Sequence, residues 1–159
     1  YVSIIPLIIV ISFLLILNYL NYLYIGDSGA YLIAFVIGIY ILKTHITNPL
    51  TSPYFFALLL WYPAFENFFS ILRKKIRKYK STLPDTKHLH QLIYRYLIRK
   101  EFRYKKYSNQ ISSIFINIYN LCIFLFSINF TDNTLYLCIL IILNILIYLF
   151  VYFILRVKD

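Results

Sequence analysis

Methionine is absent from this 159-residue chain, and charged residues make up only 14% of it. A complete translation product begins with methionine, and a bulky residue such as Tyr1 does not favour its removal. The chain also opens directly in an apolar run, without a charged leader. We therefore expect it to be the C-terminal part of a longer protein. The only two cysteines, Cys122 and Cys138, lie inside apolar runs, which is typical of small buried hydrophobic residues and not of a disulfide or a metal site.

Polar surface is scarce as well. The chain is 61% hydrophobic and 20% aromatic, with a mean hydropathy of +0.71, whereas soluble domains are about 45–50% apolar and about 25% charged. This composition excludes an ordinary soluble globule. Runs of roughly 20 apolar residues are long enough to cross a bilayer as helices. The sequence predicts an all-α, polytopic transmembrane bundle in which residues 1–159 belong to a single membrane-embedded domain. The predicted spans are about 1–24, 30–42, 54–72, 111–130 and 135–155.

Prolines and polar residues interrupt or separate these spans. The third span contains Pro63, which should kink or break the helix. Pro49 and Pro53 mark the connection before it, over 43–53. Residues 131–134 form a short polar turn between the last two spans. The remaining hydrophilic segment, 73–110, is the longest loop, and we expect it to carry an amphipathic helix at the membrane surface.

Basic residues are concentrated in that loop. The formal net charge is +10. Clustered lysine and arginine between apolar spans is typical of a cytoplasmic loop, so we do not expect a nucleic-acid partner. Counting crossings from this loop puts residues 26–29 and the C-terminal tail on the same membrane face. The thirteen basic residues of the loop are Arg73, Lys74, Lys75, Arg77, Lys78, Lys80, Lys87, Arg95, Arg99, Lys100, Arg103, Lys105 and Lys106.

The motif Gly26-Asp27-Ser28-Gly29 interrupts the first two apolar runs. A carboxylate at the edge of a span carries a desolvation penalty and is a functional candidate. The flanking glycines permit a ligand to approach the main chain. The next helix begins there, and a helix N-terminus attracts phosphate. The simpler alternative is that Asp27 or Ser28 caps that helix.

A second polar motif, 84–91, follows the basic run. Pro84 followed by Asp85 predicts a helix start with Asp85 as its cap. His88 and His90 would point about 200° apart on a helix, but in an irregular segment they could face one ligand together. With Lys87 beside them, they are candidates for holding a diphosphate. The alternative is a pair of solvated loop histidines.

Arg73 and Lys74 come first after the third span. Most of the basic run that they open is expected to be an ordinary positive flank. Since these two residues lie nearest the membrane plane, they are the candidates within the run for contacting a lipid or nucleotide phosphate.

These motifs together resemble those of the polyprenyl-phosphate N-acetylhexosamine-1-phosphate transferases. The resemblance extends over most of the chain and includes undecaprenyl-phosphate N-acetylglucosamine-1-phosphate transferase, with phospho-N-acetylmuramoyl-pentapeptide transferase as a more distant relative. The motifs that carry it are Gly26-Asp27-Ser28-Gly29, Pro63-x-x-Glu66, Arg73-Lys74 and Pro84-Asp85-x-x-His88-Leu89-His90.

The resemblance implies an enzyme of the bacterial inner membrane with its active site on the cytoplasmic face. A membrane polyprenyl phosphate would attack the β-phosphate of a UDP-sugar and release UMP. This is the first step of a lipid-linked cell-envelope glycan, such as a cell-wall polymer or lipopolysaccharide. Asp27 would bind Mg²⁺, with Mn²⁺ as the alternative, and His88 and His90 would engage the sugar-nucleotide diphosphate. Such a site suits Mg²⁺, which is often held by one or two carboxylates plus substrate phosphates.

The chain departs from the family pattern at three positions. Gln91 stands where a further histidine is common, Glu66 where an aspartate is common, and Ala30 where serine is frequent. The family's paired aspartates would lie upstream of Tyr1, so we expect the 159-residue chain alone to be inactive. A non-catalytic or degenerate membrane scaffold is the alternative, and a transporter with Asp27 in a midplane ion site ranks below it. The sequence does not decide between a monomer and a homo-oligomer.

Overall fold

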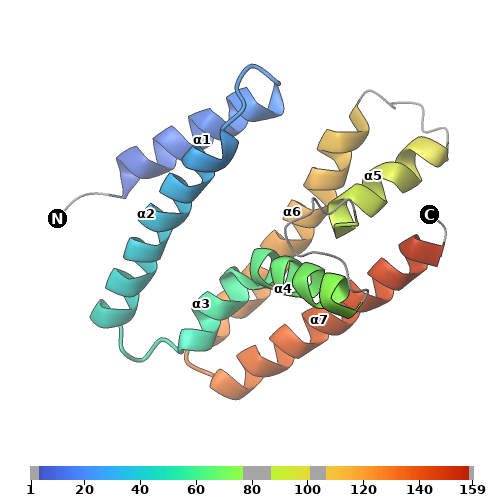
Figure 1. Cartoon of the computed structure of the whole chain (residues 1–159). Helices are drawn as coiled ribbons and strands as arrows, with labels where there is room; N and C mark the ends of the chain where they lie inside the picture. Colours follow the sequence, from blue (N-terminus) through green and yellow to red (C-terminus); the bar gives the residue numbers. More distant parts are fainter. Residues whose placement is uncertain (1–3, 77–86, 101–106, 158–159) are drawn as a thin grey trace. The chain divides into compact units, whose positions relative to one another are not determined.

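The computed structural model describes residues 4–76, 87–100 and 107–157 (Figure 1). Over these residues all of the regular secondary structure is helical and no strand forms, which confirms the predicted all-α class. It divides into two compact units, Tyr1–Asn48 and Pro49–Asp159, which are described separately below. The elements are α1 (Ile5–Tyr19), α2 (Gly26–Thr47), α3 (Pro53–Leu59), α4 (Trp61–Ile76), α5 (Leu89–Arg99), α6 (Ser108–Ser127), the 3₁₀ turn η2 (Ile128–Phe130) and α7 (Thr134–Val157).

Among the residues that the structure describes, three helical segments are long and apolar enough to cross a membrane: α2, α6 with η2, and α7. The pair α3 and α4 makes a fourth if it is counted as one broken span, because its two halves meet at a 70° bend. The length and composition of these helices support the prediction of a membrane protein with several transmembrane helices. A straight first span over 1–24 is not found, since α1 has only 15 residues.

The first unit contains α1 and α2. Helix α1 ends earlier than predicted because Asn21 adopts a left-handed conformation, with φ of 61°. The N–H of Tyr22 donates to the carbonyl of Leu17 at 2.9 Å, and that of Asn21 to Asn18 at 3.1 Å. This is the hydrogen-bond pattern of a Schellman C-cap. Helix α2 is longer than the predicted 30–42 and takes up residues 43–47, which were predicted to belong to a connection.

The break between α3 and α4 follows from Pro63. Proline has no N–H to donate, and its ring clashes with the carbonyl four residues earlier, which is that of Leu59. Helix α3 ends at Leu59, and α4 begins at Trp61. The predicted kink is therefore found, and α4 continues to Ile76, so that Arg73 and Lys74 lie on a helix and not in a loop.

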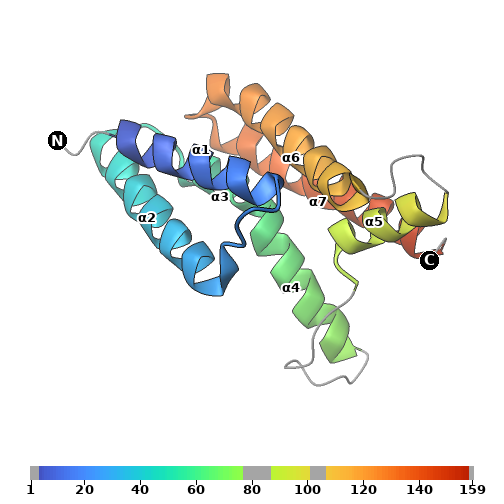
Figure 2. The ribbon, with the colours of Figure 1, turned by 90° about the horizontal axis from the view of Figure 1, so that it is seen from above.

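Helix α3 packs against α6 and α7 at the end of the second unit where the α6–α7 turn lies (Figure 2). The backbone N–H of Ser52 donates to the carbonyl of Thr131 at 2.9 Å, and its hydroxyl lies 2.9 Å from that of Thr134. The predicted turn over 131–134 is confirmed, and Asn133 caps α7 by accepting the N–H of Tyr136 at 3.0 Å. These polar contacts fix the start of α3 beside the start of α7.

Helix α4 contacts α7 through a regular set of aromatic rings. Phe65 and Phe69, one turn apart on α4, meet Tyr148 and Tyr152, one turn apart on α7. The ring centroids of Phe65 and Tyr148 are 5.0 Å apart and those of Phe69 and Tyr152 are 4.9 Å apart, both nearly perpendicular. Edge-to-face pairs of this kind are worth about 0.5–1.5 kcal/mol beyond the area that they bury. The pairing sets the register of α4 along α7.

Polar side chains also join the helices of the second unit. The indole N–H of Trp61 donates to Asn120 on α6 at 3.0 Å, and the hydroxyl of Tyr119 donates to the buried amide of Asn144 on α7. Both cysteines are free, as predicted, but Cys122 is exposed on α6 and not buried. A helix face directed toward lipid can be apolar, so hydrophobicity alone did not predict burial at this position.

Candidate functional site

Helix α5 begins at Leu89, and His88 is its N-cap residue in an extended conformation, with φ of −70° and ψ of 151°. The carboxamide oxygen of Gln91 accepts the backbone N–H of His88 at 3.1 Å. The side chain at the third helical position thus satisfies a donor at the helix start, as in a capping box. The predicted cap, Asp85, is not the start of α5, and Asp85 itself lies outside the described residues.

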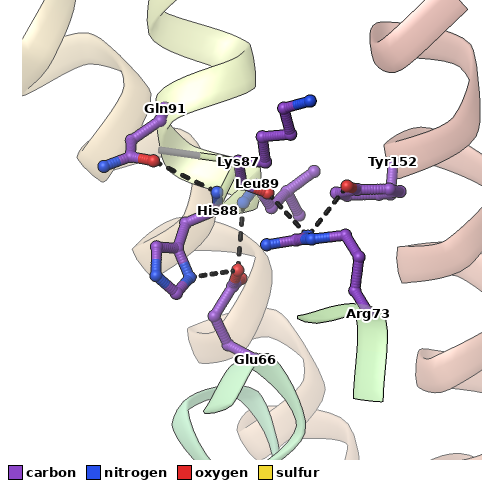
Figure 3. A network of polar contacts seen from close by, with 7 residues as sticks. All are labelled: Glu66, Arg73, Lys87, His88, Leu89, Gln91 and Tyr152. Carbon is purple, nitrogen blue, oxygen red and sulfur yellow. Dashed lines mark hydrogen bonds and ion pairs between the residues drawn. The ribbon is translucent and has the colours of Figure 1, made fainter. Parts of the chain in front are cut away.

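Glu66 of α4 provides the anion at this helix start (Figure 3). Its Oε1 accepts the N–H of Leu89 at 3.1 Å and lies 2.9 Å from Nδ1 of His88. The residue is only 7% exposed, and burying an unpaired carboxylate there would be costly. The two donors and the positive end of the α5 dipole offset that cost. Glu66 therefore joins α4 to the first turn of α5.

Arg73, two turns after Glu66 on α4, holds the same segment from a second point. Its Nη1 donates to the carbonyl of Lys87 at 2.9 Å and to the hydroxyl of Tyr152 at 2.8 Å. The guanidinium also lies over the rings of Phe69 and Tyr152, at 5.6 and 5.5 Å from their centroids. Residues seven apart lie on one face of a helix, so a single face of α4 fixes both Lys87 and His88 (Figure 3).

The two histidines of the motif lie face to face. Their ring centroids are 5.6 Å apart and the rings are nearly parallel, at 11°. This is possible because His88 precedes the helix while His90 is in its first turn, so the 200° separation expected within a continuous helix does not apply. An ionised carboxylate only accepts hydrogen bonds. Nδ1 of His88 therefore carries the proton toward Glu66, and the other ring nitrogen points away from it (Figure 3).

His90 is more easily kept neutral than a free histidine. Partial burial removes water from its imidazole and lowers its pKa below the ordinary value, and the neighbouring His88 acts in the same direction. The charge of Glu66 acts in the opposite direction but does not cancel the effect. The residue still keeps much of its surface exposed, so the effect is modest. The site thus contains one carboxylate-bound imidazole and one imidazole that favours its neutral form.

Buried polar atoms surround the second oxygen of Glu66. Oε2 and the hydroxyls of Tyr62 and Tyr148 lack a hydrogen bond of ordinary geometry within the described part of the chain. The two hydroxyls nevertheless lie close enough to interact with the carboxylate. Beside them is an apolar hollow of about 130 Å³. The residues that line it are Trp61, Tyr62, Leu89, Ile93, Phe115, Ile116, Tyr119, Ile147, Tyr148 and Val151.

In the first unit, Asp27 is the second residue of α2 and is exposed. The predicted position at a helix N-terminus is confirmed. The alternative that Asp27 or Ser28 caps the helix is wrong, because the N-cap residue is Ile25 and no side chain caps it. Gly26 has a φ of +66°, which glycine adopts readily. At Gly29, a Cβ atom would lie 2.6 Å from Cγ2 of Ile25, so a larger residue at this position would require the Ile25 side chain to shift.

Asp27 can provide one carboxylate ligand to Mg²⁺. Its side chain makes no hydrogen bond or ion pair with any residue that the structure describes, and no other acidic residue occurs in 1–48. Among the described residues, no three histidine, cysteine, aspartate or glutamate side chains converge as a metal site. The arrangement therefore fits a metal held largely by substrate phosphates and does not fit one enclosed by protein ligands.

The structure brings together Arg73, Lys87, His88 and His90 from the predicted set, and Lys74 lies half-buried on α4. Glu66 was expected only as a motif residue without a stated role and Gln91 only as a departure from the family pattern, yet both organise the start of α5. Glu66 is the only acidic residue within the predicted third span, and the rule that singled out Asp27 would also have found it. No protein-family model, curated protein or solved structure matches this chain.

Proposed function

We propose that this chain belongs to a polyprenyl-phosphate sugar-1-phosphate transferase of the bacterial inner membrane. Its substrates would be a UDP-sugar and a membrane polyprenyl phosphate, and its product a polyprenyl-diphosphate-linked sugar. The observation that carries the proposal is the histidine motif at the start of α5. There, Glu66 holds the His88 ring and Arg73 holds the carbonyl of Lys87. The rings of His88 and His90 are stacked, and an apolar hollow begins at the neighbouring Leu89.

Each residue has a role in this proposal. His88 presents its outward ring nitrogen to a diphosphate oxygen, while Glu66 maintains the tautomer and the orientation of the ring. His90 provides a second hydrogen-bonding nitrogen at the same helix start. Asp27 would hold Mg²⁺ together with substrate phosphates, and the metal would neutralise phosphate charge during transfer. The assignment of Asp27 and His88 to one reaction rests on the family resemblance.

The same proposal includes about five membrane spans, with α1 as the first and the basic end of the second unit on the cytoplasmic side. The distribution of basic residues supports this orientation. The described basic residues of the second unit lie on α4, α5 and α7 and beside α5, and none lies in 49–60 or in the α6–α7 turn. An excess of lysine and arginine is typical of cytoplasmic segments.

UMP release by a full-length parent protein tests the proposed reaction. Membranes containing the parent would be given a UDP-sugar and a polyprenyl phosphate, with and without Mg²⁺. Asp27→Asn should reduce Mg²⁺-dependent release at least about 100-fold, because even partners outside the first ligand shell of a metal cost about 10–100-fold. Asp132→Asn, the same change in the exposed α6–α7 turn, is the control. Wild-type turnover by the Asp27 variant would remove this residue from the site.

A membrane scaffold without catalytic activity is the second candidate. It is favoured by the way Glu66 and Gln91 already satisfy donors at the start of α5, which is a sufficient structural reason for the polar residues of the motif. A scaffold predicts that neither the full-length wild type nor its His88→Gln variant releases UMP. Loss of release in this variant, with normal amounts of folded protein, supports the transferase.

A further inference from the structure

A second hollow lies between the C-terminal parts of α4 and α7. Its volume is about 150 Å³. Two of its lining residues are arginines, one from each helix, and the others are apolar. The lining residues are Phe69, Leu72, Arg73, Ile76, Phe153 and Arg156.

Arg73 reaches this hollow as a fixed cation. It is 7% exposed, and its two hydrogen bonds from Nη1 and its position over two rings restrict the side chain. A guanidinium held in this way loses little further conformational freedom when it binds an anion, because its donors are already oriented. Arg156 is half-buried in the last turn of α7. The hollow thus combines one buried and one half-buried positive charge.

The place of the hollow along the helices limits what can occupy it. Helix α7 is apolar enough to cross a membrane, and Arg156 lies in its last turn, which puts the two guanidiniums near the level of lipid headgroups. The apolar residues Phe69 and Phe153 lie toward the bilayer side of these charges along their helices. Basic pockets between transmembrane helices at the headgroup level bind anionic lipids.

We propose that this hollow binds the phosphate of an anionic membrane phospholipid. Arg73 and Arg156 contact the phosphate, and the four apolar residues contact the glycerol and the first part of the acyl chains. Two adjacent cations repel the ammonium group of a zwitterionic headgroup, so a lipid with net negative charge, such as phosphatidylglycerol, is favoured. This goes beyond the proposed transferase function and does not depend on it.

Native mass spectrometry of the purified full chain tests the proposal. The protein would be relipidated with phosphatidylcholine alone or mixed with phosphatidylglycerol, and the retained lipids counted. The wild type should retain phosphatidylglycerol in preference to phosphatidylcholine. Arg156→Gln should weaken this retention about five-fold, since one basic residue near anionic lipid is worth about a factor of that size. Lys75→Gln removes the same charge from the exposed side of α4, outside the hollow, and should retain lipid like the wild type.

Three results would overturn the proposal. Equal weakening by Arg156→Gln and Lys75→Gln would mean that the general positive field binds the lipid. Equal retention of the two lipids would mean that the guanidiniums do not select. Displacement of phosphatidylglycerol by inorganic phosphate or glycerol phosphate at comparable concentrations would mean that the apolar walls contribute nothing. Arg156→Lys, which keeps the charge but not the planar group, should bind between the wild type and Arg156→Gln.

Discussion

The carboxylate of Glu66 lies 2.9 Å from Nδ1 of His88 and also accepts the N–H of Leu89. One side chain on α4 therefore determines both the orientation of an imidazole and the start of α5. Glu66→Gln keeps the shape but removes the charge, and we expect it to lower stability by about 1–3 kcal/mol, the usual range for a hydrogen bond to a charged group. Thermal unfolding in detergent micelles measures this.

Gln91→Ala is the matched comparison for Glu66→Gln. It removes the other side chain at the start of α5, and loss of a capping side chain costs about 0.5–2 kcal/mol. Hydrogen exchange of the amides in 88–92 should increase in both variants. If Glu66→Gln were to unfold at the wild-type temperature with unchanged exchange, the carboxylate would not be holding the helix start.

Tyr152 and Tyr148 provide a contrast within one helix. The Tyr152 hydroxyl accepts a hydrogen bond from Arg73 at 2.8 Å, whereas that of Tyr148 is buried without one of ordinary geometry. Tyr152→Phe should therefore cost about 1–3 kcal/mol, because a charged donor loses its acceptor. Tyr148→Phe should cost less than Tyr152→Phe, because the Tyr148 hydroxyl lies close to the Glu66 carboxylate without a hydrogen bond of ordinary geometry to it. Equal costs for the two variants would contradict this assignment.

The lowered pKa of His90 predicts a pH dependence of stability. In the unfolded chain a histidine titrates near its ordinary pKa of about 6.5, so between that value and the lower folded pKa the unfolded state binds more protons. Stability contributed by neutral His90 is thus present above pH of about 6.5 and is lost as pH falls toward the folded pKa. The measurement is the difference in unfolding temperature between the wild type and His90→Gln, followed from neutral to acidic pH. This difference separates the contribution of His90 from the contributions of Glu66 and His88.

If acidification made the wild type more stable relative to His90→Gln, the pH dependence of stability would have the opposite sign. It would mean that the charge of Glu66 outweighs partial burial, and that the folded state favours protonated His90.

Gly29 and Ile25 are expected to be coupled. A Cβ at residue 29 would lie 2.6 Å from Cγ2 of Ile25, and a β-branched side chain has few ways to move aside. Gly29→Ala should destabilise α2 by about 1–3 kcal/mol, as overpacking does. Ile25→Ala combined with Gly29→Ala should recover most of that loss, which a double-mutant cycle measures. Additive costs would exclude this contact as the reason for glycine.

Local rules predicted much of the fold. Apolar runs gave the positions of α6 and α7, and Pro63 gave the break before α4. The boundaries that were wrong depended on contacts between elements. The start of α5 is set by Glu66, a side chain of another helix, and no local cap rule contains that information. The early end of α1 depends on Asn21, which adopts a left-handed conformation within the apolar run that predicted a span over 1–24.

The candidate site was predicted in part for the same reason. The spacing of His88 and His90 allowed either opposed or neighbouring rings, and only the position of the helix start decides between them. Glu66 and Arg73 lie seven residues apart, so their common face on α4 could have been read from the sequence. Their common target could not, because Lys87 and His88 meet α4 only through tertiary packing.

The 70° bend between α3 and α4 has a consequence for the surrounding lipid. At 1.5 Å per residue, the 16 residues of α4 extend roughly 24 Å and the 24 residues of α7 roughly 36 Å. Neither half of the bent pair alone matches a hydrocarbon layer of about 30 Å. The bilayer beside α4 should therefore be thinner than the bilayer beside α7. A membrane that can thin locally next to α4 would accommodate this protein best.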